Sequence, residues 1–439
     1  MAKGKSKAGR KQSSGIKILI INLHSSYNAG DDVLTRVTIS QLKQSFVHPQ
    51  IILAMNDPAS HDGQEKAVGS FMSWLKPKNK SQFSWGVLKI PWLLSLCLLT
   101  VVFYRLFGVP KLDWMSPARR ELVHAYLEAD LVVSSAGNFL YSSGYGITLL
   151  VTLFTIKYAM LLGKPVYMMP QTVGPLSHGW ERKLTAFVLR GMRLCFVRDA
   201  ISKLELEKMK VWAENCTIVP DMAFLFPSVP PKDGQTFLPD ANIHEKRQSW
   251  LGVTLINWEA QNKLFRQQAR YETAVAAAIR HFVQVYNGVV FLFGQVRGPT
   301  SADDDIVPAR RVKKKLAQLE NKVVLVEKVL SAEQLKAAYG QMDLFIGTRL
   351  HSNIFALSQG VPAILIQYQY KTEGVAKMLD LEEWVLNIET IEPNAIICKL
   401  DALANQEHEL RRKITNTVAK IEKQIVQVSE KIAADFENL

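Results

Sequence analysis

Short apolar runs recur along the chain, and a polar, often glycine-bearing loop follows most of them. The first run, residues 16–22, reads I-K-I-L-I-I-N, which is typical of a buried parallel strand. Segments with helical spacing of apolar positions lie between the runs, for example residues 33–46 and 147–162. This alternation predicts an α/β protein with parallel sheets. Further strands are expected at 129–135, 166–169, 193–197, 217–219, 250–256, 288–293, 323–326, 343–346 and 362–366, and further helices at 271–286 and 352–359.

The length of 439 residues exceeds what one hydrophobic core usually serves, so we expect two domains. Near the C-terminus, apolar residues spaced by four and three form a single stripe along a long helix. We expect this helix to pack across both domains, and the alternative is a short coiled coil in a homodimer. The predicted segments are a disordered basic tail at 1–14, a first domain at 15–228, a proline-rich linker at 229–248, a second domain at 249–399 and the helix at 400–439.

The first domain contains a hydrophobic insert at about 85–109. Its central run, residues 90–104, carries no charge and would form a helix of about 22 Å, shorter than the roughly 30 Å hydrocarbon core of a bilayer. Basic residues flank it on both sides, and aromatic residues lie near its ends: Trp85, Trp92 and Tyr104. The pattern favours a helical hairpin that lies on the membrane or enters it. The alternative is a buried helix of the first domain, and a complete span is least favoured.

The apolar fraction of 48% is that of a folded globular protein, but the net charge of +13 indicates an anionic partner. A membrane surface or an anionic substrate fits better than nucleic acid, because aromatic and basic residues do not interleave as strand-binding proteins require. No cluster of His, Asp or Glu residues in the sequence has the spacing of metal ligands, so we expect no metal and no required cofactor. The four cysteines are expected to be buried thiols of a protein in the reducing cytoplasm, and the N-terminus does not resemble a secretory signal peptide.

The segment Gly347-Thr348-Arg349-Leu350-His351 joins a predicted strand to a predicted helix. Backbone N–H groups and the dipole at a helix start attract an anion. Arg349 offers a planar fork for a carboxylate or phosphate, and His351 offers a proton near neutral pH. These residues therefore predict an anion site, and the alternative is an ordinary helix start with a surface Arg and a capping His.

Other polar clusters also fall where predicted strands end, which is where open α/β sheets bind ligands. They contain Asn28, Gly30 and Asp31 after the first strand, Gly137 and Asn138 after the second, Gln171 after the third and Arg198 after the fourth. Two further charged groups are expected to be solvated loops instead: Asp303-Asp304-Asp305, and Lys371 with Glu373.

In order and spacing these segments resemble the polysaccharide pyruvyl transferase family, from about Ile18 to Ile388 with gaps at the insert and the linker. The glycine-rich element departs from the usual G-G-G form, since Ala136 and Asn138 flank one glycine. The resemblance rests on N-A-G-D at 28–31, A-G-N at 136–138, P-Q-T-V-G-P at 170–175, R-D at 198–199 with Ser202, P-D at 220–221, G-T-R-L-H at 347–351 and G-V-P at 360–362.

The resemblance implies two Rossmann-like domains in a GT-B-like arrangement with the site in the cleft between them. It also implies transfer of pyruvate from phosphoenolpyruvate to a pair of sugar hydroxyls as a ketal. We expect Arg349 and Arg198 to clamp the donor, His351 to act as general acid, and Asp31 to accept a hydroxyl proton or orient the acceptor. Asn28, Gly30, Gly137, Asn138, Gln171, Gly347 and Thr348 complete the expected substrate site.

The expected partners are phosphoenolpyruvate and a saccharide acceptor, either free or lipid-linked, with the protein peripheral on the inner face of the cytoplasmic membrane. Two other functions stay open at this point. One is a glycosyltransferase of the same fold with a nucleotide-sugar donor, since fold does not settle function. The other is an inactive membrane-bound scaffold that organises polysaccharide synthesis.

Overall fold

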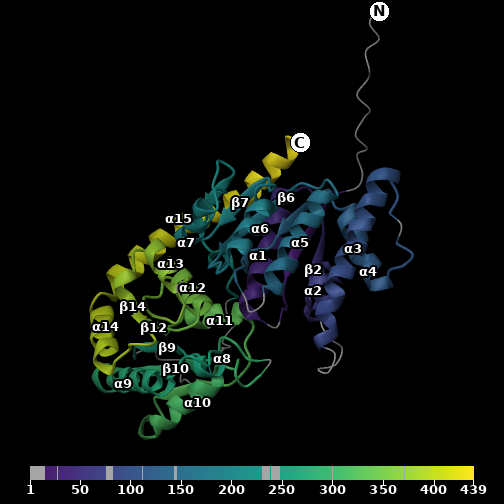
Figure 1. Ribbon diagram of the computed structural model, residues 1–439. Coiled ribbons are helices and arrows are strands. Elements are labelled where there is room, and N and C mark those ends of the chain that lie inside the picture. Colours follow the sequence, from purple (N-terminus) through teal and green to yellow (C-terminus); the bar gives the residue numbers. More distant parts are fainter. Residues whose placement is uncertain are drawn as a thin grey trace, which may run out of the picture.

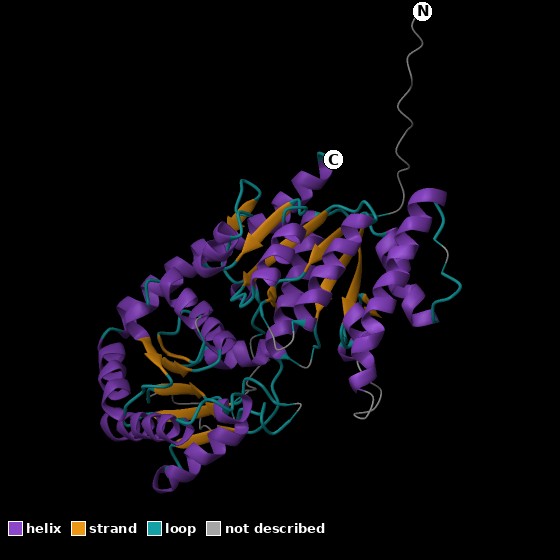
Figure 2. Cartoon of the chain, viewed as in Figure 1, coloured by secondary structure: helices purple, strands orange, loops and turns teal. Residues whose placement is uncertain are grey.

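The chain folds into two parallel β-sheets, each covered by helices on both faces (Figures 1 and 2). The computed structural model describes residues 15–26, 28–75, 83–110, 112–142, 146–229, 238, 248–298, 300–369 and 371–439, without the side chains of 29, 83–90 and 93. The predicted tail at 1–14 and most of the predicted linker at 229–248 lie outside these residues.

The first sheet has the strand order β3-β2-β1-β4-β6-β7-β8, all parallel, and β5 pairs with the far end of β6. Side chains alternate between its two faces, so that Ile18 and Ile20 of β1 pack on one core and Leu19 and Ile21 on another. The elements are β1 (Lys17–Leu23), α1 (Ala29–Ser45), β2 (Gln50–Met55), β3 (Lys66–Gly69), α2 (Phe71–Leu75), α3 (Phe83–Phe107), α4 (Pro117–Glu128), β4 (Leu131–Ser134), β5 (Gly137–Leu140), α5 (Ile147–Leu161), β6 (Val166–Val173), α6 (Gly179–Leu189), β7 (Leu194–Val197), α7 (Ala200–Lys208) and β8 (Cys216–Ile218), with short 3₁₀ turns η1 (Pro58–Ser60) and η3 (Met222–Leu225).

The second sheet has the order β11-β10-β9-β12-β13-β14, also parallel throughout. Its elements are β9 (Trp250–Thr254), α8 (Trp258–Gln261), α9 (Gln268–Tyr286), β10 (Val289–Phe293), α10 (Ile306–Lys315), η4 (Ala317–Leu319), β11 (Val323–Val326), α11 (Ala332–Tyr339), β12 (Leu344–Gly347), α12 (Leu350–Ser358), β13 (Ala363–Gln367), α13 (Lys371–Met378), η5 (Glu382–Trp384), β14 (Val385–Asn387) and α14 (Pro393–Asn405).

The structure confirms the α/β class with two parallel sheets, and each of the ten predicted strands is present. Strands β2, β3, β5 and β14 were not predicted, and three of them have only three or four residues. Gly137 and Asn138 were expected after the second predicted strand, but they lie in a further strand, β5, which Gly137 begins at a φ of +142° that a glycine adopts easily. Gln171 was expected after the third predicted strand, but this strand, β6, continues past it to Val173.

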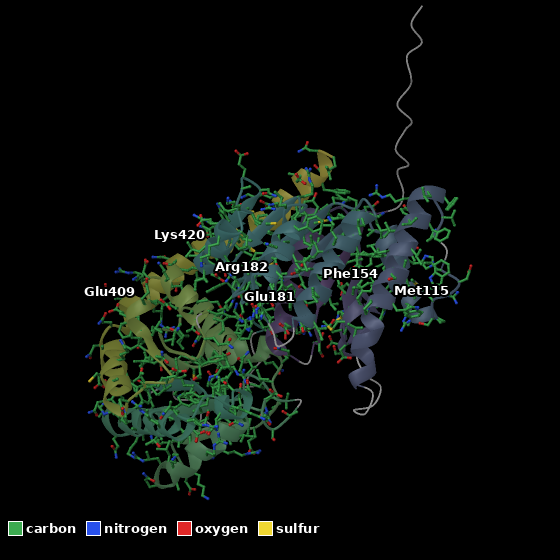
Figure 3. The ribbon with its side chains drawn as sticks, viewed as in Figure 1. Met115, Phe154, Glu181, Arg182, Glu409 and Lys420 are labelled. Carbon is green, nitrogen blue, oxygen red and sulfur yellow. The ribbon has the colours of Figure 1, made fainter. Side chains whose placement is uncertain are left out.

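The long C-terminal helix α15 (Glu407–Glu437) packs across both domains, as predicted. It contacts α1 of the first domain and α12 of the second, and the side chains of its apolar stripe are buried. At its end, Asp435 accepts hydrogen bonds from Arg193 and Tyr167. Glu409 and Lys420, labelled in Figure 3, lie on its solvent-exposed side. The buried stripe comprises Leu410, Ile414, Val418, Ile421, Ile425, Val428 and Ile432.

The hydrophobic insert forms α3, a single continuous helix, so the predicted hairpin was wrong. One side of α3 packs against α2 and α5, where the Thr100 hydroxyl lies 2.7 Å from the Tyr158 hydroxyl. The other side is exposed, and the alternative of a fully buried helix therefore describes only half of it. Among the described residues, no helix combines the length and the hydropathy needed to cross a bilayer.

The prediction that all four cysteines are buried was wrong for one of them. Cys97, Cys195 and Cys216 are buried, whereas Cys398 on α14 is exposed. None of the four forms a disulfide.

Truncation of a buried α15 residue should destabilise the protein far more than truncation of an exposed one. Ile425→Ala removes a side chain with no exposed area and leaves a cavity, which typically costs about 2–5 kcal/mol. Thermal unfolding should show a melting temperature several degrees lower for Ile425→Ala and nearly unchanged for the matched control Lys420→Ala. Equal melting temperatures for the two variants would contradict the interdomain packing of α15.

Candidate functional site

A cavity of about 870 Å³ opens between the two domains, at the carboxyl ends of the strands of both sheets. Eight of the eleven predicted site residues line it, namely Asn28, Gly30, Asp31, Gly137, Asn138, Arg198, Arg349 and His351. The cavity is also lined by residues that the sequence analysis did not assign to the site, among them His24, Gln295, Tyr368, and Asp303 and Lys371, which were expected in solvated loops.

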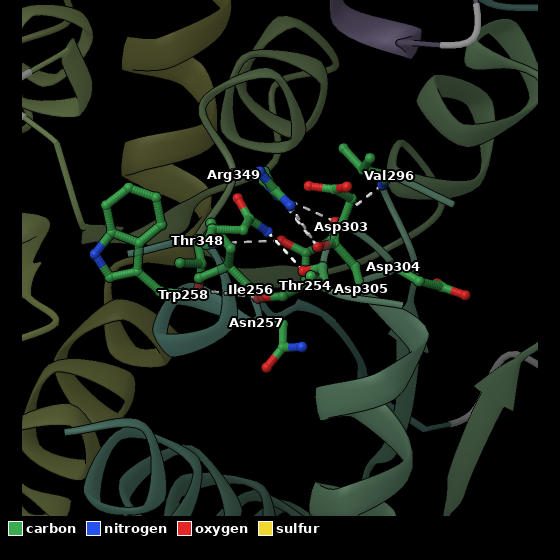
Figure 4. A network of polar contacts seen from close by, with 12 residues as sticks. Thr254, Ile256, Asn257, Trp258, Val296, Asp303, Asp304, Asp305, Thr348 and Arg349 are labelled. Carbon is green, nitrogen blue, oxygen red and sulfur yellow. Dashed lines mark hydrogen bonds and ion pairs between the residues drawn. The ribbon is translucent and has the colours of Figure 1, made fainter. Parts of the chain in front are cut away.

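On the second-domain side, Arg349 forms a buried ion pair with Asp305 (Figure 4). Its Nε and Nη2 donate to the two Asp305 oxygens at 2.8–3.2 Å, and the backbone N–H of Val296 donates to the same carboxylate. The prediction that Asp305 belongs to a solvated turn was therefore wrong: it has no exposed area. Burial raises the pKa of this carboxyl although Arg349 opposes the shift. The pair fixes the guanidinium at the start of α12.

Tyr368, which follows β13, packs beside the same guanidinium. Burial raises the pKa of its phenol, and the nearby charge of Arg349 opposes that rise. Its ring also meets Trp258 edge to face, with centroids 4.8 Å apart. Tyr368 therefore forms part of a rigid wall behind Arg349.

On the first-domain side, Arg198 forms a second buried ion pair. Its Nη1 donates to Asp221 at 2.6 Å and its Nε donates to the Thr172 hydroxyl at 2.5 Å. Burial alone would raise the pKa of Asp221. Arg198, His351 and the backbone N–H of Ala223 outweigh this effect, so the pKa lies below its ordinary value. Among the described residues Nη2 of Arg198 has no partner, so this nitrogen can donate to a ligand.

His351 lies in the first turn of α12 and packs against the first turn of α1 in the other domain. A Cβ atom at Gly30 would come within 2.4 Å of its Nδ1, so only glycine fits there. Burial lowers the pKa of His351, and Arg198 lowers it further, while Asp221 and Asp31 oppose the shift. The ring is therefore neutral at pH 7, and its Nε2 is buried without a partner among the described residues.

Lys371, at the start of α13, points its charge into the same group of side chains. Burial and the neighbouring Arg198 lower its pKa to about 7, although Asp31 and Asp221 oppose the shift. The prediction that Lys371 belongs to a solvated loop was therefore wrong. The loop lies at the carboxyl end of β13, so the rule that selected Arg198 and Arg349 could have selected Lys371 as well.

Two features of the cavity wall suit a polar, ring-shaped ligand. His24 and Phe139 of the first domain stack with centroids 4.9 Å apart. Asn138 Oδ1 on the first-domain side and Gln295 Nε2 on the second-domain side are buried without partners among the described residues. Buried polar atoms nearly always have partners, so these two and His351 Nε2 are candidates for contact with a ligand.

The structure does not bring three of the predicted residues to the cavity. Gln171 is fully buried within β6. Thr348 is buried too, and its hydroxyl donates to the Thr254 carbonyl and lies 2.7 Å from the Tyr271 hydroxyl. Gly347 lies against Asn353, whose Oδ1 would be 1.8 Å from an added Cβ. Thr348 and Gly347 support the loop that carries Arg349, whereas Gln171 lies within the first sheet, where its Nε2 donates to the Ser135 carbonyl.

Comparisons with known proteins give both a family and a fold. A family model described as polysaccharide pyruvyl transferase matches residues 28–370. The amylovoran biosynthesis protein AmsJ of Erwinia amylovora is 25% identical over 278 residues, which are 59% of this chain and 63% of AmsJ. The match therefore spans a little under two thirds of that relative.

Solved structures resemble the chain over nearly its whole length. A UDP-N-acetylglucosamine 2-epimerase has a TM-score of 0.56 at 11% identity, covering 96% of this chain and 95% of that one. HepE of Anabaena in complex with UDP and glucose has a TM-score of 0.54 at 11% identity, covering 97% and 100%. The MnaA–UDP structure from S. aureus scores 0.53 at 13% identity, covering 95% and 94%. At such identities the similarity shows the fold alone, which is the GT-B-like pair of Rossmann-like domains.

The electrostatic arrangement around His351 predicts how its pKa responds to a mutation. The pKa should lie below the ordinary value of 6.5, and Asp221→Asn should lower it further, because the Asp221 charge favours the protonated ring. NMR titration of histidine-labelled protein, with His351→Gln to assign the signal, measures both values. Glu207→Gln, which removes an exposed carboxylate of α7, should leave the His351 titration unchanged. A rise on Asp221→Asn would show that the two groups do not interact as described.

Proposed function

Because the chain belongs to the polysaccharide pyruvyl transferase family, we propose that it transfers pyruvate from phosphoenolpyruvate to sugar hydroxyls and forms a pyruvate ketal. The acceptor is a sugar of a cell-surface or lipid-linked polysaccharide. The observation that carries the proposal is the convergence of Arg198, Arg349, Lys371 and His351, from both domains, on one interdomain cavity.

The donor carries a carboxylate and a phosphate, and the cavity offers a separate cation for each. Arg198 approaches from the first domain with its Nη2, which has no partner in the described part of the chain, while Arg349 and Lys371 approach from the second. Each arginine already has an aspartate partner, so the guanidinium groups are held in place before the donor arrives. The protonated form of Lys371 and the N-terminus of α12 supply the additional positive charge that the donor needs.

The reaction needs a proton at the methylene carbon of the donor. His351 supplies this proton. Its ring, neutral in the protein alone, takes the proton up when the negative charges of the donor raise the pKa of the ring. Protonation converts the C=C bond to a methyl group and leaves an oxocarbenium-like carbon. One sugar hydroxyl adds to this carbon, the C–O bond to phosphate breaks, and a second hydroxyl closes the ketal. The two sugar hydroxyls release two protons. One restores to the enzyme the proton that His351 delivered to carbon, and the other leaves with phosphate.

The first-domain wall of the cavity is the proposed acceptor side. The stacked pair of His24 and Phe139 offers an aromatic surface for a sugar ring, and Asn138 Oδ1 offers an acceptor for a hydroxyl. Asp31 lines the cavity near His351 and is the proposed base for the attacking hydroxyl. We place the enzyme on the cytoplasmic side of the membrane, since its four cysteines form no disulfide.

A nucleotide-sugar donor is the second candidate. The reason to keep it is that solved structures of the same fold, such as HepE, hold UDP. Calorimetry with phosphoenolpyruvate and with UDP-glucose separates the two candidates, because a pyruvyl transferase binds the first and is indifferent to the second.

Phosphate release from phosphoenolpyruvate should depend on a saccharide acceptor and on His351. We expect His351→Ala to lower kcat by about 10²–10⁴-fold, the usual contribution of a general acid. A colorimetric phosphate assay over a panel of lipid-linked and model saccharides measures this loss. The control is His408→Ala, since His408 is exposed on α15. Near-wild-type turnover by folded His351→Ala protein would refute the role of His351 as general acid. Turnover with UDP-glucose as the sole donor would refute phosphoenolpyruvate as the donor.

Donor affinity should fall as pH rises through the pKa of Lys371. This lysine is charged below about pH 7 and neutral above it, and only the charged form attracts the anionic donor. Calorimetric titration of phosphoenolpyruvate from about pH 6 to pH 9 should show progressive weakening above pH 7. Lys371→Met should bind more weakly at low pH and lose most of this dependence. The control Lys377→Met, exposed on the same helix, should keep the wild-type profile, and an identical profile for Lys371→Met would contradict the role of Lys371.

A further inference from the structure

Helix α3 exposes an apolar stripe on the side that faces away from the protein. Trp92, Leu99, Val102 and Leu106 follow one another by seven, three and four positions, which places them on one side of the helix. Their side chains are between 46% and 69% exposed. Large apolar side chains exposed in a row along one helix mark an interaction surface.

The opposite side of the same helix is part of the first domain's core. Cys97 and Val101 are buried, and Cys97 lies in a small apolar hollow with Phe71 and Phe154. The hydrogen bond between Thr100 and Tyr158 fixes the rotation of α3 about its own axis. The stripe is therefore held outward by the fold.

The apolar surface continues beyond the end of α3. Gly108, with a φ of +69°, ends the helix, and Phe107, Val109 and Trp114 are exposed around the turn that follows. Within the described residues, eight of the twenty large hydrophobic side chains that are exposed fall between 92 and 114. Figure 1 shows α3 and α4 at the rim of the molecule that lies farthest from the second domain. This concentration at one rim distinguishes the region from scattered surface apolar residues.

The charged residues that flank this apolar run in the sequence are all basic. Residues 67–112 contain no Asp and no Glu, and they contain six Lys and Arg residues: Lys76, Lys78, Lys80, Lys89, Arg105 and Lys111. An anionic lipid surface attracts such a segment by roughly 1 kcal/mol per basic residue that reaches it. Two copies of this chain facing each other here would instead bring like charges together, because a two-fold interface places the same surface on both sides.

We propose that the exposed face of α3, with Phe107, Val109 and Trp114, docks the first domain on an anionic lipid bilayer. The helix lies in the plane of the interface: its apolar stripe enters the boundary between headgroups and acyl chains, and its other side stays in the protein. The tryptophans occupy the headgroup level, where this side chain is favoured. The inference concerns a surface outside the cavity and does not depend on the donor or on the reaction.

The test is flotation of the full chain with lipid vesicles. The protein should float with vesicles of phosphatidylcholine and phosphatidylglycerol and much less with phosphatidylcholine alone. Adding salt should weaken the binding only in part, because burial of the stripe is not screened. Leu99→Asp combined with Leu106→Asp should lower the partition coefficient at least about tenfold, since each leucine loses its burial in the lipid. Both side chains are exposed, so the melting temperature should stay unchanged.

The matched control places the same two charges elsewhere. Leu264→Asp combined with Val285→Asp alters two exposed apolar residues of the second domain and should float like the wild type. The proposal is overturned if the wild type does not float. It is also overturned if Leu99→Asp with Leu106→Asp floats as well as the wild type at low and at high salt. It is also overturned if sedimentation velocity shows a wild-type dimer that this α3 variant converts to a monomer, since the face would then bind a second copy.

Discussion

The close approach of two helix N-termini across the domain boundary is the constraint on which the site depends. The first turn of α1 meets the ring of His351 in the first turn of α12, and the contact leaves no room for a side chain at Gly30. Because the first turns of both helices line one cavity, their dipoles add positive potential from two directions.

Each domain holds its arginine of the cavity in a buried ion pair. Arg198 pairs with Asp221 in the first domain, and Arg349 pairs with Asp305 in the second. Breaking a buried pair by removing one partner costs about 3–5 kcal/mol, so each aspartate is as much a part of the site as its arginine. What remains variable is the protonation of Lys371 and His351, both of which burial shifts toward the neutral form. An anion that bound here, as proposed, would raise the pKa of both groups and so favour their protonated forms.

The sequence predicted the parts that depend on local pattern. The ten strands, the helix crossing both domains and eight residues of the cavity follow from apolar periodicity and from the position of polar residues at strand ends. The prediction from sequence failed where segments distant in the chain determine whether a residue is buried. Asp305 looks like one of three solvated carboxylates until Arg349, 44 residues away, is placed beside it. Gln171 follows an apolar run and looks like the start of a loop. In the structure β6 continues past Gln171, because β5 and β7 pair with β6 at this position and bury the residue. For α3, an apolar run cannot reveal that one side meets α5 while the other meets solvent.

The helix α15 changes how the two domains can move. One continuous hydrophobic core includes Ile20 of the first sheet, Phe355 of the second domain and Ile432 near the C-terminus. In a two-domain enzyme joined by a linker alone, the cleft opens by rotation about a hinge. Here such a rotation would have to strip α15 from one domain and expose its stripe to water. The remaining low-energy motions are small sliding movements of α15 along α1 and rearrangements of the loops at the cavity mouth. A polymeric acceptor of the proposed reaction would therefore have to enter through a mouth of nearly fixed width to reach His351.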